Sequence, residues 1–246
     1  MIRILSIGNS FSQDAQAYLH EIAAAGGREV KAVNLYIGGC SLKTHWENAE
    51  QDAKQYLYEC NGASEGRMVS IREALEEEAW DFVTLQQASA FSGCYDTYEP
   101  YLSDLSAYVS GHAPSAKQVI HETWAYERGF ESAAYDEFYQ GSQEKMYAAL
   151  HEAYQRAAAL LNIPILPCGT VIQELRRTAP FEYQTGGRSL CRDGCHMDIP
   201  YGRYILGAVW YESLLHGDIT ANTWLPAESD PALIRFLQDK IHTLLN

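Results

Sequence analysis

Three side chains, distant from one another in the sequence, have the types that nucleophilic acyl transfer requires. Ser10 comes shortly after the apolar run Ile2–Ile7. Asp193 lies three residues ahead of His196 in a polar stretch much further along the chain. An aspartate at this spacing can bring its carboxylate to one imidazole nitrogen, which fixes the tautomer and stabilises the imidazolium. We therefore predict that Ser10 is a nucleophile, His196 its general base and Asp193 the orienting acid.

These residues can meet only if the fold brings distant parts of the sequence together. Five short apolar runs alternate with segments that have the period of an amphipathic helix. The predicted strands are residues 2–7, 30–37, 80–85, 118–123 and 163–166, and the clearest predicted helices run from Asp14 to Gly26, from Ser142 to Leu161 and onward from Asp230-Pro231. Strands separated by helices pair in parallel through right-handed crossovers, which predicts a three-layer α/β/α sandwich. No repeat, low-complexity tract or linker divides the sequence, so we expect a single domain over residues 1–246.

Small and polar residues follow the first four predicted strands. They are Gly8-Asn9-Ser10, Gly38-Gly39-Cys40-Ser41, Gln86-Gln87-Ala88-Ser89 and Trp124-Ala125-Tyr126. In open parallel sheets, ligands bind at the carboxyl ends of the strands, where the N-termini of helices also point. We therefore expect two glycine turns, two amides and several hydroxyls to converge at one edge of the sheet.

At these positions the chain resembles the SGNH hydrolases, the superfamily that includes GDSL-type esterases and lipases. Gly8-Asn9-Ser10 matches the block that is usually Gly-Asp-Ser, with Ser10 at the position of the nucleophile. Gly38 or Gly39 matches the glycine of the second block, and Asp193-x-x-His196 matches the last block. The resemblance implies a flavodoxin-like sandwich with a central sheet of five parallel strands. It also implies ester hydrolysis by a Ser-His-Asp triad, without a metal or an organic cofactor.

The third block of that superfamily, Gly-x-Asn-Asp, is missing from this sequence. In its place the third predicted strand ends in Gln86-Gln87. Some carbohydrate esterases of the superfamily have a glutamine there, in a Gln-Gly-Glu pattern that aligns best with Gln86. Either glutamine side chain can donate an N–H. The resemblance therefore implies an oxyanion hole made of the backbone N–H of Ser10, an N–H of Gly38 or Gly39, and the amide of Gln86 or Gln87.

Each of these residues, taken singly, also has an ordinary structural explanation. Small polar residues after a strand commonly form turns or helix caps, and glutamines at a strand end can satisfy loop backbone. Asp193 and His196 can be a surface pair without a function. The occurrence of all of these residues in the order of the family, on strands that place them together, favours a catalytic site.

Cys191 and Cys195, together with Asp193 and His196, also suggest a metal site. A structural zinc site needs four well-placed ligands, and the sequence has no second cysteine or histidine pair at ribbon or finger spacing. We therefore predict no metal. The six cysteines are scattered along the 246 residues, so we expect reduced thiols rather than a disulfide framework.

A polar connection that is rich in aromatic residues follows the fourth predicted strand. Long connections within a compact fold are often functional, and this one begins at the expected active-site edge. Its rings can stack on a sugar, although they can equally pack the connection onto the body of the protein. The predicted substrate-binding residues are Asn9, Trp124 and Tyr126. We expect a small-molecule substrate with a short acyl ester, and an O-acetylated sugar is the leading candidate.

The composition excludes some partners and leaves two other functions open. A net charge of −14 disfavours nucleic acid and anionic membrane surfaces. No apolar run approaches the ~20 residues that cross a bilayer, and the N-terminus lacks a signal-peptide pattern, so we expect a cytoplasmic protein. One alternative is a flavodoxin-like module that binds a nucleotide or flavin phosphate at residues 8–13. The other is a catalytically inactive relative that only binds its ligand. The oligomeric state is not predicted.

Overall fold

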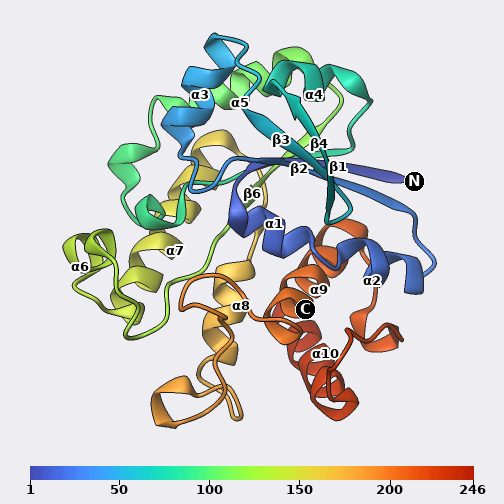
Figure 1. The fold of residues 1–246 in the computed structure, drawn as a ribbon, viewed down its shortest axis with the longest axis vertical. Helices are drawn as coiled ribbons and strands as arrows, with labels where there is room; N and C mark the ends of the chain where they lie inside the picture. The colour runs from blue at the N-terminus through green and yellow to red at the C-terminus, as the bar shows by residue number, and fades with distance from the viewer.

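The computed structural model describes residues 1–246, apart from the side chains of Glu65 and Gln184, and has a seven-stranded sheet at its centre (Figure 1). The strand order is β4-β3-β2-β1-β5-β6-β7. The parallel strands are β1 Ile2–Gly8, β2 Val30–Tyr36, β5 Phe82–Leu85, β6 Lys117–His121 and β7 Ile165–Leu166. These strands confirm the five that were predicted. Their order, in which the second strand lies outside the first, is flavodoxin-like.

Two antiparallel strands extend the sheet beyond β2 and are not predicted by the sequence pattern. β3, Tyr56–Cys60, pairs with β2, and β4, Ala63–Val69, pairs with β3 at the edge. The sequence of β4, ASEGRMV, alternates poorly and contains a glycine and two charged residues. An exposed edge strand has little apolar surface to bury, so it needs no apolar run. The hairpin therefore leaves a weak signal in the sequence.

Helices cover both faces of the sheet, which confirms the predicted three-layer sandwich. One layer contains α3 Leu42–Glu50, α4 Ile71–Glu77, α5 Tyr101–His112 and α7 Gln143–Leu161. The other contains α1 Ser10–Gln16, α2 Leu19–Ala25, α8 Cys168–Leu175, α9 Tyr201–Leu215 and α10 Pro231–Leu245. The connections contain α6 Ala133–Tyr139 and the short 3₁₀ helices η1 Ser89–Phe91, η2 Tyr95–Thr97, η3 Tyr183–Thr185 and η4 Ile219–Ala221. Figure 1 shows α3, α4 and α5 on one side of the sheet and α1, α2, α9 and α10 on the other.

The predicted helix from Asp14 to Gly26 is in fact two helices, and the first of them begins earlier than predicted. Asn9 caps α1, because its side-chain oxygen accepts a hydrogen bond from the backbone N–H of Phe11 at 2.9 Å. Ser10 is therefore the first helical residue, immediately after the carboxyl end of β1. The helices predicted over residues 142–161 and after Asp230 are present as α7 and α10.

Apolar side chains fill the space between the sheet and both helix layers. Helix α9 is buried on almost every side, and its Val209 and Trp210 are fully buried. Among the residues that the structure describes, none of the helices combines the length and the apolar character needed to cross a bilayer. The single-domain organisation of residues 1–246 stays a prediction.

Candidate active site

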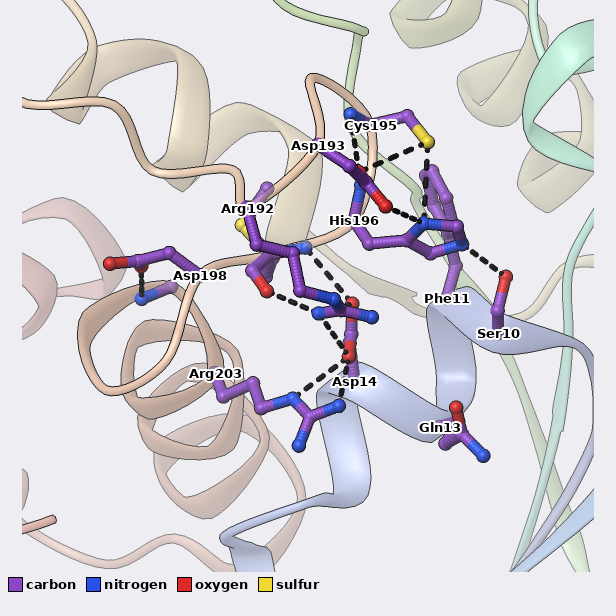
Figure 2. Close-up of polar contacts among 12 residues, drawn as sticks. Ser10, Phe11, Gln13, Asp14, Arg192, Asp193, Cys195, His196, Asp198 and Arg203 are labelled. Atoms are coloured by element: carbon purple, nitrogen blue, oxygen red, sulfur yellow. Dashed lines mark hydrogen bonds and ion pairs between the residues drawn. The ribbon is translucent and has the colours of Figure 1, made fainter. Parts of the chain in front are cut away.

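The structure brings Ser10, His196 and Asp193 into one hydrogen-bonded series (Figure 2). The Oγ of Ser10 lies 2.8 Å from Nε2 of His196. On the other side of the ring, Nδ1 of His196 lies 2.7 Å from Oδ2 of Asp193. Because an ionised carboxylate only accepts, Nδ1 carries the proton and Nε2 presents its lone pair to the serine. The imidazole is therefore held in the tautomer that a general base needs.

Asp193 accepts hydrogen bonds from its own loop as well as from the imidazole. Its Oδ1 accepts the backbone N–H of His196 at 2.7 Å and that of Cys195 at 3.1 Å. Partial burial opposes ionisation, but these hydrogen bonds and the one from the imidazole outweigh it, so the pKa of Asp193 is held well below its usual range. The carboxylate is thus ionised at neutral and mildly acidic pH.

The start of α1 fits closely against the strand that precedes it. Ser12, one turn into the helix, contacts both the backbone of Asn9 and the side chain of Asn34 through its hydroxyl. A Cβ on Gly8 would lie 1.9 Å from that hydroxyl oxygen, so only glycine fits at the end of β1. This packing fixes where the helix begins and hence where Ser10 lies.

Asp14 links helix α1, which carries Ser10, to the loop that carries His196. It is fully buried, and its carboxylate accepts the backbone N–H of Met197 at 2.9 Å. The same carboxylate accepts the guanidinium of Arg192 at 3.0 Å and that of Arg203, from α9, at 2.8–2.9 Å. Figure 2 shows both arginines converging on Asp14 beneath the triad. Sequence analysis missed these three residues, because nothing in the pattern of α1 indicates that its aspartate is buried.

An aromatic stack supports the base from the other side. The ring of Phe11 lies 4.1 Å from that of Trp124 and parallel to it, and it meets the His196 ring edge-on at 5.8 Å. The indole N–H of Trp124 donates to the carbonyl of Cys195 at 2.7 Å. Trp124 is 0% exposed, so its predicted stacking on a sugar is corrected: the ring lies beneath the loop and holds it.

The loop that carries the base also closes onto the connection after β6. The N–H of Glu127 donates to the carbonyl of Gly194 at 2.8 Å. Gly194 has a φ of +87°, and a Cβ there would lie 2.7 Å from the ring of Phe130. Glycine is therefore required at this turn, between Asp193 and His196.

Tyr126, the other predicted aromatic contact for substrate, is also largely inside the protein. It is buried, and its hydroxyl lies 2.7 Å from Oγ of Ser89. Asn9 is buried as well: its side-chain oxygen accepts from Phe11 and Gln86, and its amide donates to the carbonyl of Cys40 at 3.2 Å. These residues shape the site from within, and their contact with substrate stays a prediction.

The two glutamines have different surroundings. The amide of Gln86 donates to Oδ1 of Asn9 at 2.8 Å, and its oxygen lies 2.7 Å from Nδ1 of His121. Burial lowers the pKa of His121 to about 3, so this ring is neutral and donates its Nδ1 proton to the glutamine. His121 thereby fixes which end of the Gln86 amide faces Asn9.

Gln87 is engaged by loop backbone. Its oxygen accepts the N–H groups of Leu42 and Ala88, and its nitrogen donates to the carbonyl and hydroxyl of Thr97 at 3.0–3.1 Å. Its amide therefore joins three segments of chain, which matches the ordinary explanation for a strand-end glutamine.

Gly38 and Gly39 form an exposed turn between β2 and α3. Gly39 has a φ of +63°, in the left-handed region that favours glycine. The next residue, Cys40, is tied to Asn9 by the hydrogen bond described above, which places this turn beside the start of α1. The role of either glycine N–H in an oxyanion hole stays a prediction.

A free thiol lies directly against the triad. Sγ of Cys195 is 3.4 Å from Nδ1 of His196 and 3.5 Å from Oδ1 of Asp193. Burial, followed by the negative charge of Asp193, raises the pKa of Cys195 to about 12. The other cysteine of the loop, Cys191, is buried and contacts the guanidinium of Arg176 at 3.3 Å.

The fold and this arrangement of residues define a class of protein. One solved structure that resembles the chain is a protein from Slackia heliotrinireducens described as a candidate SGNH hydrolase, with 24% identity, coverage of 86% of this chain and 97% of that one, and a TM-score of 0.59. Another is a catalytic mutant of an acetylxylan esterase from Geobacillus stearothermophilus, with 13% identity, coverage of 86% and 93%, and a TM-score of 0.54. The chain has the fold of the SGNH hydrolases, as the sequence blocks predict.

Within that class, the chain belongs to the DUF4886 family, a domain of unknown function whose model matches residues 3–236. It is similar to a DUF4886 family protein from Bacteroides uniformis, for which there is a crystal structure. The two share 35% identity over 99% of this chain and 94% of the other, with a TM-score of 0.90. No curated protein matches the chain.

Proposed function

We propose that this protein is a serine esterase that hydrolyses short acyl esters, with Ser10 as its nucleophile. The observation that carries the proposal is the uninterrupted series of contacts from Ser10 Oγ to His196 Nε2, and from Nδ1 to Asp193. It joins residues that lie 186 positions apart in the chain. All three roles of nucleophilic acyl transfer are thereby filled by adjacent groups.

The proposed reaction has two half-reactions. Ser10 Oγ attacks the ester carbonyl while Nε2 of His196 takes the hydroxyl proton. The tetrahedral intermediate collapses when His196 gives this proton to the departing alcohol, which leaves an acyl-enzyme. Water then attacks the acyl-enzyme in the same way, and the proton returns to Ser10 as the carboxylic acid departs. Asp193 stabilises the imidazolium in both halves.

The proposed oxyanion hole uses backbone and amide donors. The N–H of Ser10 and an N–H of Gly38 or Gly39 are two of them. The third is the Gln86 amide, which has two hydrogens and uses one on Asn9. We assign this role to Gln86 rather than Gln87, because Thr97 accepts from the Gln87 amide. Fixed donors of this kind stabilise the transition state without having to reorient.

The decisive experiment compares two serines at helix starts on the same edge of the sheet. Ser10→Ala should abolish hydrolysis of p-nitrophenyl acetate, and a fluorophosphonate probe should label the wild type at Ser10. Ser41→Ala, which removes the cap of α3, should keep both activity and labelling. Unchanged turnover in the Ser10 variant would overturn the proposed function.

For the substrate, we propose an acetyl ester of a polar alcohol, with an acetylated sugar first. A depression of about 540 Å³ adjoins Asp193, and its lining includes the rings of Phe130 and Tyr183 beside the exposed charged groups of Arg128 and Glu131. Rings next to charged groups suit a sugar. The acetylxylan esterase among the structures of similar fold agrees with this choice. Acetylated xylo-oligosaccharides, sialate esters and longer acyl esters form the test panel, and a preference for octanoyl or longer chains would contradict it.

The alternative of phosphate binding at residues 8–13 finds less support. The capping side chain of Asn9 already occupies the N–H of Phe11, which a phosphate at this helix start would need. A purified protein that is not yellow would exclude a bound flavin. The cytoplasmic location stays a prediction.

A further inference from the structure

The loop that carries His196 contains three side chains of the kinds that bind metal ions, and their possible ligand atoms lie close together. A carboxylate oxygen of Asp193, Sγ of Cys195 and Nδ1 of His196 all lie within 4.8 Å of one another. We propose that these three atoms bind a single Zn²⁺ ion reversibly, and that the bound ion inactivates the base of Ser10. The inhibitory part of this proposal rests on the proposed function, whereas the binding part does not.

The spacing of the three atoms is close to that of a tetrahedral zinc site. Zinc takes thiolate at about 2.3 Å, imidazole nitrogen at about 2.0–2.1 Å and carboxylate oxygen at about 2.0–2.2 Å, so tetrahedral ligand atoms lie about 3.4–3.6 Å apart. Sγ of Cys195 already lies 3.4 Å from Nδ1 of His196 and 3.5 Å from Oδ1 of Asp193. The other carboxylate oxygen, Oδ2 of Asp193, lies 2.7 Å from Nδ1, and this contact has to open when the ion takes the Nδ1 lone pair.

The site is accessible and its backbone is fixed. The side chain of Asp193 is 47% exposed and that of His196 is 28% exposed, so an ion can reach both groups from solvent. Water can supply the fourth ligand. The indole of Trp124 holds the carbonyl of Cys195, which keeps the thiol beside the imidazole. The nearby positive charge of Arg192 is paired with Asp14.

Metal binding and base catalysis require opposite tautomers of the same ring. The ion needs the lone pair of Nδ1, so the neutral imidazole must then carry its proton on Nε2. The Cys195 thiol loses its proton to solvent when it becomes a ligand. With Nε2 protonated, the hydroxyl of Ser10 has no acceptor for its proton. Zinc at this site therefore removes the general base without touching the serine.

Zinc binding can be measured without any substrate, by competition with a chromophoric chelator. We expect one equivalent of Zn²⁺ to bind to the wild type, to Ser10→Ala and to the control Cys94→Ser, which alters a half-buried thiol in a different segment. In Cys195→Ser, which retains the backbone N–H but loses the soft ligand, the apparent dissociation constant should rise at least ~10-fold. Equal affinity in Cys195→Ser and the wild type would show that zinc binds elsewhere, for example at Glu212, Asp218 and His242, and would overturn the proposal.

Two further measurements separate this proposal from the proposed function. ¹⁵N chemical shifts of the His196 ring should show a change from an Nδ1–H to an Nε2–H tautomer when zinc is added, whether or not the protein hydrolyses esters. An unchanged tautomer would contradict the inference. If ester hydrolysis is found, zinc should inhibit the wild type at the concentrations at which it binds. For each variant, the rate with zinc is divided by the rate of the same variant without zinc. Cys195→Ser should then need at least ~10-fold more zinc for the same inhibition.

Discussion

Asp14 accepts the backbone N–H of Met197 at 2.9 Å, across 183 residues of sequence. Asp14 follows Ser10 by a single helical turn, and Met197 follows His196 directly. The hydrogen bond therefore fixes the distance between the segment that carries Ser10 and the segment that carries His196. Since Arg192 and Arg203 bind the same carboxylate, the loop and helix α9 are fixed to α1 at one point.

Asp14→Asn is expected to lower both stability and activity. It leaves two partly exposed arginines without the carboxylate that pairs with both of them, which should lower the unfolding free energy by ~1–3 kcal/mol. A displacement of His196 by about 1 Å should also reduce kcat by ~10²-fold. Urea unfolding and initial rates measure the two effects. Arg203→Met, which leaves Arg192 on Asp14, should cost less, and wild-type stability in Asp14→Asn would refute this account of the clamp.

Asp193→Asn is expected to preserve the fold and lose most of the turnover. Asparagine can keep the backbone hydrogen bonds through its oxygen, but it cannot hold the imidazole in the required tautomer, so kcat should fall by ~10³–10⁴-fold. Because the pKa of Asp193 is held well below its usual range, protonation of this group should not limit activity at mildly acidic pH. Rates on p-nitrophenyl acetate from about pH 5 to 8 test both statements. Asp96→Asn, at an exposed carboxylate of η2, is the control.

Substitutions of Gln86 and Gln87 should have different effects, one on turnover and the other on stability. Gln86→Ala removes a proposed oxyanion donor and should lower kcat by ~10²–10³-fold. Gln87→Ala breaks the bonds to Thr97 and to the backbone of Leu42 and Ala88, so its main effect should be on the urea midpoint. The reverse pattern, with kcat falling in Gln87→Ala alone, would transfer the role to Gln87.

Stability should decline as the pH rises through the titration of His151. Nδ1 of this histidine lies 2.8 Å from a buried oxygen of Glu122, and this hydrogen bond raises the pKa of His151 above its ordinary value of 6.5. The stabilisation is complete below that value and is lost as the pH passes through the raised pKa. Urea unfolding at about pH 6 and about pH 9 should show a smaller decline in His151→Gln than in the wild type. The side chain is 41% exposed, so the effect is modest, and equal declines would exclude this pair as the cause.

The parallel core of the fold is predictable because buried strands must be apolar. Strands β1, β2 and β5 are mostly apolar, and β6 has Val119 and Ile120 at its centre. The helix patterns between these strands leave parallel pairing as the natural solution. The β3–β4 hairpin is not predictable in this way, since an edge strand can carry polar residues on exposed positions. The break between α1 and α2 is also missed, because both helices continue the same apolar face.

The site is predictable where its residues are local motifs and unpredictable where they act through distant partners. Ser10 and the pair Asp193 and His196 occur in short patterns whose spacing has chemical meaning. Asp14 and His121 have no such pattern, because their importance comes from partners 183 and 35 residues away. The prediction that Trp124 contacts a sugar was wrong because the sequence shows that an aromatic ring is present but does not show which way the ring faces.

The great separation between the nucleophile and its base also has a consequence during translation. Ser10 is synthesised before Asp193 and His196, which follow much later in the chain. A nascent or prematurely terminated chain that lacks the loop over residues 191–197 has a serine with no acceptor for its proton. The proposed esterase activity therefore requires that this loop has been synthesised and docked on Asp14.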